Sequence, residues 1–117
     1  MENLSLSEVN FVNLCPHDIN IYTNDGQLIM RLTRNSNAPR LVERRIIYGE
    51  ISGIKVNNVR LTLDGVDLPP YIPKTYYIVS RVLAEYARRS DFLIPDELIR
   101  DEQGRIIGCT SFAVVTD

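Results

Sequence analysis

The sequence predicts an α+β domain, namely a mostly antiparallel, strongly bent sheet or partial barrel that carries one main helix. Three observations lead to this fold class. Short runs of alternating apolar and polar residues recur along the chain, and turn-forming residues bound each of them. The continuous β-rich run TYYIVS is typical of a central strand that is covered on both faces. A single segment, directly after that run, has the spacing of an amphipathic helix.

The first strands are predicted from alternation and from turn residues. Residues 8–14 alternate and predict a strand, which the proline of CPHD ends. The runs INIY and LIMRL flank the turn sequence TNDGQ, so we expect a hairpin that pairs residues 19–23 with residues 28–33.

The middle of the chain predicts two more strands and an irregular loop. The run RLVERRIIY alternates, and the glycines of GEISG indicate a bulge or corner. In NVRLTL, Val59, Leu61 and Leu63 share one face, which predicts a half-buried strand. Three prolines within residues 69–73 then require a crossing loop.

The last third of the chain contains the predicted helix. Ser80 is a plausible N-cap, and an apolar stripe follows it, made of Val82, Leu83, Tyr86 and Ala87. A short segment in PDELIR, a DEQG turn and a final strand over residues 105–115 complete the sequence.

Length and charge restrict the class of protein. The 117 residues fit a single domain, 1–117, in which residues 1–7 form a flexible or loosely attached N-terminus. A formal net charge of −2 argues against a general binder of nucleic acid or of membranes. The chain shows no membrane-spanning run and no signal-peptide pattern, so we expect a cytoplasmic protein with Cys15 and Cys109 as reduced thiols.

The segment NLCPHDI brings together two reactive residue types, Cys15 and His17, around a proline. Residues two apart on an extended chain point to the same side, so a thiol–imidazole pair is geometrically possible. A zinc site would need a carboxylate besides Cys15, His17 and Cys109. Two other interpretations stay open: His17 contacts a ligand, or Cys15 is a small buried residue and His17 a turn residue.

Other candidate groups are cationic or lie at a helix start. Ser80 ends a strand and begins a helix, where free N–H groups suit a phosphate or carboxylate, although a plain N-cap explains the residue without any ligand. Arg60 lies mid-strand, opposite the apolar face, and Arg100 and Arg105 flank an acidic turn. Paired carboxylates occur only in turns, so we predict no catalytic residues, no metal and no cofactor.

These motifs resemble a family of short, mostly hypothetical phage and bacterial proteins. Its pattern NLTPH is matched by NLCPH over residues 13–17, and its strand–helix junction YIVS by residues 77–80. The C-terminal pattern RDxxGRIIGC is matched over residues 100–109. The resemblance extends from about residue 13 onward. Because that pattern has threonine at the position of Cys15, a nucleophilic cysteine there would not be a family activity.

The resemblance implies a phage-like context, and from it we expect a small protein that sequesters a nucleotide-derived signal of host antiviral immunity without turnover. Such a protein needs cations for phosphate and aromatic faces for a base. We expect a homo-oligomer with pockets between its subunits, and the expected ligand-binding residues are His17, Tyr48, Arg60, Tyr77, Ser80, Arg100, Arg105 and Cys109.

Two other classes of function remain open. A nucleotide-processing enzyme would use His17 as acid or base. A protein-interaction or virion-associated module would use an exposed sheet edge.

Overall fold

The structure is a computed structural model that describes residues 8–116. The predicted flexible segment, residues 1–7, lies outside the described residues. Within the described range the chain forms eight strands and one helix. In chain order these are β1 (Asn10–Asn13), β2 (Ile19–Tyr22), β3 (Leu28–Leu32), β4 (Val42–Ile51), β5 (Ile54–Thr62), β6 (Thr75–Ile78), α1 (Arg81–Ala87), β7 (Phe92–Arg100) and β8 (Ile106–Val114).

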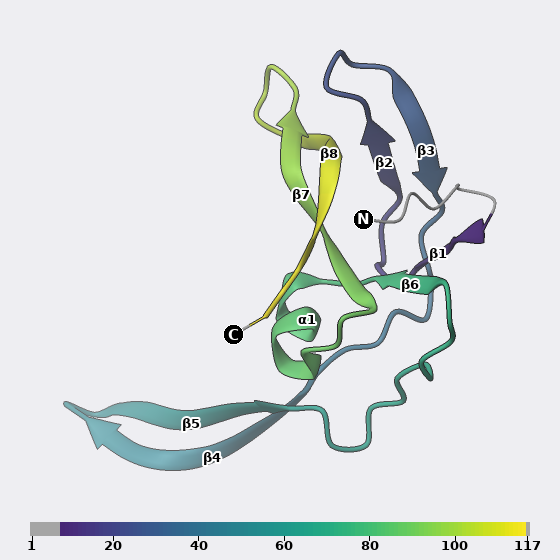
Figure 1. Ribbon diagram of the computed structural model, residues 1–117. Helices are drawn as coiled ribbons and strands as arrows, with labels where there is room; N and C mark the ends of the chain where they lie inside the picture. The colour runs from purple at the N-terminus through teal and green to yellow at the C-terminus, as the bar shows by residue number, and fades with distance from the viewer. Residues whose placement is uncertain (1–7, 117) are drawn as a thin grey trace.

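Six strands form one sheet in the order β1-β6-β7-β8-β2-β3, and β4 pairs with β5 as a separate two-stranded sheet (Figure 1). The three hairpins, β2–β3, β4–β5 and β7–β8, are antiparallel. The pairings β1–β6, β6–β7 and β8–β2 are parallel. The six-stranded sheet is therefore mixed, and antiparallel pairing is confined to the hairpins. One parallel pairing, β6–β7, follows from the crossover through α1, since a tight turn cannot join parallel strands.

The sheet is bent until its two edge strands meet, so that it is nearly closed and barrel-like. The edge strands β1 and β3 contact each other. The side-chain amide of Asn13, the last residue of β1, donates hydrogen bonds to the carbonyls of Leu32 (3.3 Å) and Thr33 (3.2 Å) at the end of β3. The expected bent sheet with one helix is thus found, although strand residues greatly outnumber helical residues. The six-stranded sheet is mixed, where the sequence predicts a mostly antiparallel one, because three of its five pairings are parallel.

Two apolar clusters cover the two faces of the central strand β6. The side chain of Ile78 packs in one cluster with Ile19 and Leu93. Tyr77 packs in the other cluster with Leu83 of α1 and with neighbouring residues. Successive side chains of a strand point to opposite faces, and both faces of β6 are covered. The prediction of a central strand in TYYIVS is therefore confirmed.

The helix begins where the sequence predicts it but packs in a different register. The Ser80 hydroxyl accepts a hydrogen bond from the Leu83 N–H (3.3 Å), which confirms the predicted N-cap. The buried residues of α1 are Leu83 and Ala84. Val82 and Tyr86, which the predicted stripe would bury, are 46% and 47% exposed. The prediction was wrong for these two side chains because this short helix contacts the body through only one narrow side.

The strands β4 and β5 form a long hairpin, here called the arm, that projects away from the rest of the molecule (Figure 1). The segment GEISG forms its tip, where Ser52 and Gly53 have φ of 51° and 81°, a conformation that suits a tight hairpin turn. A register shift lies between Ile47 and Gly49, as expected for a bulge. Val59 is 48% exposed, so this part of β5 is not the half-buried strand that the sequence predicts.

Candidate functional site

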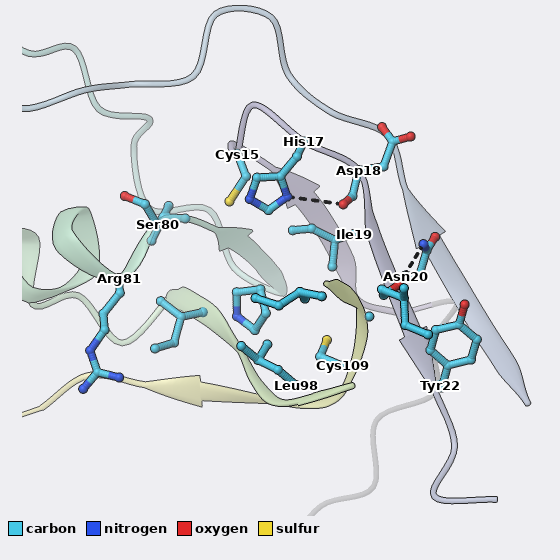
Figure 2. Close-up of a pocket in the computed structure, with 16 residues that line it drawn as sticks. Cys15, His17, Asp18, Ile19, Asn20, Tyr22, Ser80, Arg81, Leu98 and Cys109 are labelled. Carbon is cyan, nitrogen blue, oxygen red and sulfur yellow. Dashed lines mark hydrogen bonds between the residues drawn. The ribbon is translucent and has the colours of Figure 1, made fainter. Parts of the chain in front are cut away.

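An open pocket of about 1000 Å³ lies between the Pro-His turn with β2, the junction of β6 with α1, and the β7–β8 hairpin (Figure 2). This volume is at the upper end of the range found for small-molecule sites. Its apolar lining comes largely from the aliphatic side chains of Ile19, Val79, Ile94, Leu98, Ile106 and Ile107. Such a lining favours a ligand that has a substantial apolar or aromatic part.

Polar side chains also line the pocket. They are contributed by His17, Asp18, Asn20, Tyr22, Ser80 and Arg81. Nδ1 of His17 lies 3.3 Å from the carbonyl oxygen of Asp18, so the second ring nitrogen, Nε2, is available to another partner (Figure 2). The guanidinium of Arg81 pairs with Glu85 one helical turn later (3.0 Å) and is largely exposed. Pairs of this exposed kind are weak, so Arg81 can exchange this partner for an anionic ligand group.

The Pro-His turn is held in place by Asn13, which is buried. Its side-chain oxygen accepts a hydrogen bond from the Cys15 N–H (2.8 Å), and its amide donates to the His17 carbonyl (3.0 Å). The same amide reaches the end of β3, as described above. One side chain therefore fixes both the closure of the sheet and the backbone that presents His17 to the pocket.

Asp18 links this turn to β3 and to the residues that follow β3. Its carboxylate accepts hydrogen bonds from the Arg31 guanidinium (2.8 Å) and from the Arg34 backbone N–H (2.8 Å). These two bonds, that from Arg31 above all, lower the pKa of Asp18. Asp18 is thus engaged in positioning the turn.

The two cysteines are buried, unpaired and protonated at neutral pH. Burial raises the pKa of Cys15 to about 11 and also raises the pKa of Cys109. The Cys15 thiol donates a hydrogen bond to the Ile78 carbonyl (3.6 Å). Because the thiolate is the nucleophile and the metal ligand, this environment disfavours thiol catalysis and metal binding. Within residues 8–116 no cluster of three or more histidine, cysteine or carboxylate side chains is placed to hold a metal ion.

Position 108 requires glycine because the pocket wall leaves no room for a side chain there. A Cβ built at this position would lie 2.4 Å from the Tyr22 ring and 2.8 Å from the Asn20 carbonyl oxygen. The absent side chain lets β8 approach β2 closely, where Ile21 pairs with Cys109. This explains the glycine of the GRIIGC motif as a packing requirement.

Three of the residues expected from the sequence line the pocket, namely His17, Ser80 and Cys109. Tyr77 does not line it. The Tyr77 ring is 4% exposed, packs edge-on against Phe92, and donates its hydroxyl proton to the Pro70 carbonyl (2.9 Å). Tyr77 therefore stabilises the core and the proline-rich loop, and it is not available to stack on a ligand in this pocket.

The remaining expected residues lie away from the pocket of this chain. Tyr48 and Arg60 lie on the arm. Arg100 donates to the Gly104 carbonyl (2.8 Å) and Arg105 pairs with Asp101 (3.1 Å), so both brace the β7–β8 turn. The expected convergence of these arginines on one hollow with His17 is not found.

Arg81 and Asn13 are two of the site residues that sequence reasoning missed, besides lining residues such as Asn20, Tyr22 and Leu98. Arg81 directly follows Ser80, and its position on the first turn of a helix at a strand end could have indicated a cation near the site. Asn13 begins the NLCPH motif, which could have indicated its bonds to Cys15 and His17, but nothing in the sequence indicated its contacts with the end of β3, 19 and 20 residues away.

Comparison of the chain with protein-family models, with curated proteins and with solved structures finds no match. Among the described residues, no helix has the length and apolar character needed to cross a membrane. The function is therefore argued from the pocket itself.

Proposed function

We propose that the protein binds and sequesters a small molecule in this pocket without converting it. The observation that supports the proposal is the pocket itself: it is large and mostly aliphatic, and both of its cysteines have thiols with raised pKa values. The Ser80 hydroxyl already caps α1, and within residues 8–116 the His17 ring contacts a backbone carbonyl rather than a carboxylate. Binding groups are thus present in the pocket, and none of the described residues that line it is an activated nucleophile.

The ligand class we propose is a nucleotide-derived signal of host antiviral immunity, consistent with the phage-like context of the sequence motifs. A base would lie against the aliphatic wall around Leu98 and Ile107, and an anionic group would lie near His17 and Arg81. Because Arg60, Arg100 and Arg105 lie elsewhere, the pocket suits a ligand with one or two phosphates better than a polyphosphate.

The test has two stages. Small molecules that co-purify with the protein from phage-infected cells are released by heat and identified by mass spectrometry. The purified protein is then titrated with AMP, cyclic AMP and ADP-ribose in a thermal-shift assay and by calorimetry. We expect a compound of this class to be recovered unchanged and to raise the melting temperature by several degrees.

Variants separate this pocket from other sites. Leu98→Arg places a bulky cation at the apolar wall and His17→Ala removes the imidazole, so both should weaken binding at least tenfold. Arg105→Ala, outside the pocket, is the matched control and should bind as the unaltered protein does. A processed compound in the released fraction, whose formation stops in His17→Ala, would show an enzyme instead. The absence of any thermal shift and of any recovered compound would contradict the proposal.

A further inference from the structure

The arm leaves a large apolar surface uncovered in the single chain. Ile46, Ile47, Tyr48, Ile51 and Ile54 are each between 63% and 75% exposed. Together they present an apolar area on the order of several hundred Å² over the two faces of the arm, and exposed apolar surface of this extent marks interaction sites. The radius of gyration is 17.8 Å, whereas a compact chain of this length has about 13 Å. The arm therefore extends from the body and exposes a surface suited to contact another molecule.

Both faces and both edges of the arm are available. Residues that pair across a hairpin share a face, so Ile46 and Asn58 lie on one face and Ile47 and Asn57 on the other. Each of the two strands pairs only with the other. A two-stranded hairpin is marginally stable alone in water. Apolar residues on both faces suit a protein surface that surrounds the arm better than the flat surface of a membrane.

The arm also carries unpaired positive charge. Arg44 and Arg60 lie directly opposite each other, and neither has an ion-pair partner within the described residues. Like charges in this position repel and destabilise the hairpin unless an acidic group lies between or beside them. The partner of the arm should therefore present carboxylates next to an apolar patch.

The chain itself has a surface with this chemistry, at the mouth of the pocket. Leu98, Ile106 and Ile107 are between 44% and 54% exposed there. On the same hairpin, Asp96 and Glu97 are exposed and form no ion pair within residues 8–116. We propose that the arm of one copy docks across the pocket mouth of a second copy, with Arg44 and Arg60 facing Asp96 and Glu97 of that copy.

This contact would complete the pocket. It places isoleucines and Tyr48 of one copy over the open mouth of the other, which adds a second tyrosine ring to that of Tyr22 in the pocket lining. The role of the arm in ligand capture rests on the proposed function, whereas the assembly of two copies through the arm does not depend on it. Its test is made without ligand, so that failure of one proposal is distinguishable from failure of the other.

The first experiment measures the molar mass of the full chain by light scattering after size exclusion. We expect at least twice the 13.4 kDa of the chain. The double variant Ile46→Asp/Ile47→Asp should be monomeric. Its dissociation constant for self-association should be at least about a hundredfold higher, and its circular dichroism spectrum should be unchanged. The matched control is Leu28→Asp/Ile29→Asp, a neighbouring pair on β3 with 55% and 50% exposure, and it should remain assembled.

The second experiment tests the site on the partner by charge reversal. Arg44→Glu/Arg60→Glu and Asp96→Arg/Glu97→Arg should each be monomeric alone, because like charges meet across the interface. Mixed in equal amounts, the two variants should assemble with each other, because the acidic arm of the first variant meets the basic pocket mouth of the second. A monomeric unaltered protein, or an assembly that the β3 control disrupts and the arm variant does not, overturns the proposal.

Failure of the mixture to assemble overturns the assignment of the pocket mouth as the docking site. Co-purification of nucleic acid that is lost in Arg44→Glu/Arg60→Glu, with an unaltered protein that stays monomeric, would instead show the arm to be a β-ribbon for nucleic acid, and would equally overturn the proposal.

Discussion

Replacing Asn13 should both loosen the closed sheet and displace His17, because this one side chain joins β1, the Pro-His turn and the end of β3. In Asn13→Ala the amide's two hydrogens and its oxygen are lost, and with them the contacts to the Cys15 N–H and to three carbonyls. Counting three hydrogen-bonding groups at about 1 kcal/mol each gives a loss of about 3 kcal/mol in the free energy of unfolding.

A loss of this size is large for a chain of 117 residues, whose total stability is about 5–15 kcal/mol. It corresponds to a decrease in melting temperature of about 10 °C. Chemical denaturation followed by circular dichroism measures it directly. The control is Asn58→Ala, because Asn58 is exposed on the arm and its side chain forms no hydrogen bond within residues 8–116; it should change stability by less than about 0.5 kcal/mol.

Asn13→Asp makes the test stricter, because it keeps the size of the side chain and its oxygen acceptor for Cys15. It replaces the donating amide by an oxygen that faces the carbonyls of His17, Leu32 and Thr33. We expect this variant to be at least as unstable as Asn13→Ala at neutral pH and to recover partly in acid, where a protonated carboxyl can donate one hydrogen bond. Full stability of Asn13→Asp at pH 7, or equal stabilities of Asn13→Ala and Asn58→Ala, would refute the role assigned to Asn13.

Three further predictions follow from the packing. Gly108→Ala should cost about 2–3 kcal/mol and narrow the pocket, because the new methyl group meets the Tyr22 ring and a backbone oxygen; denaturation curves measure the first effect, and a stable variant would contradict the close contact. Arg89→Lys should destabilise the fold by about 2 kcal/mol. The Arg89 guanidinium donates two hydrogen bonds to the buried Asp91 carboxylate (2.6 and 3.0 Å) and one to the Pro69 carbonyl (2.7 Å), and a lysine cannot form all three. Neither Cys15 nor Cys109 should react with a thiol reagent in the native protein at pH 8, and both should react after denaturation. Folding raises the pKa of each thiol, so the contribution of the two thiols to stability is complete below the unfolded pKa. This contribution is lost as the pH rises through the folded pKa, which for Cys15 is about 11.

Local signals in the sequence determined the elements of this protein. The turn TNDGQ, the alternation on either side of it and the Ser80 cap are properties of neighbouring residues, and the structure contains the predicted hairpin, helix start and central strand. His17, Ser80 and Cys109, three of the residues expected at a ligand site, do line one pocket. These expectations were correct because short-range geometry, capping and hydrophobic periodicity act before any distant contact forms.

Only the tertiary structure decided which strands pair in parallel, where the arginines lie and which apolar residues remain uncovered. The alternation in β5 predicts a half-buried strand, yet the β4–β5 hairpin projects from the body because the six-stranded sheet already meets at its own edges. Asn13 could not be identified as the closing residue, since its partners near residue 32 are brought to it by the bend of the whole sheet. Burial and charge pairing depend on contacts between distant segments, and a linear pattern contains no information on the distance between them.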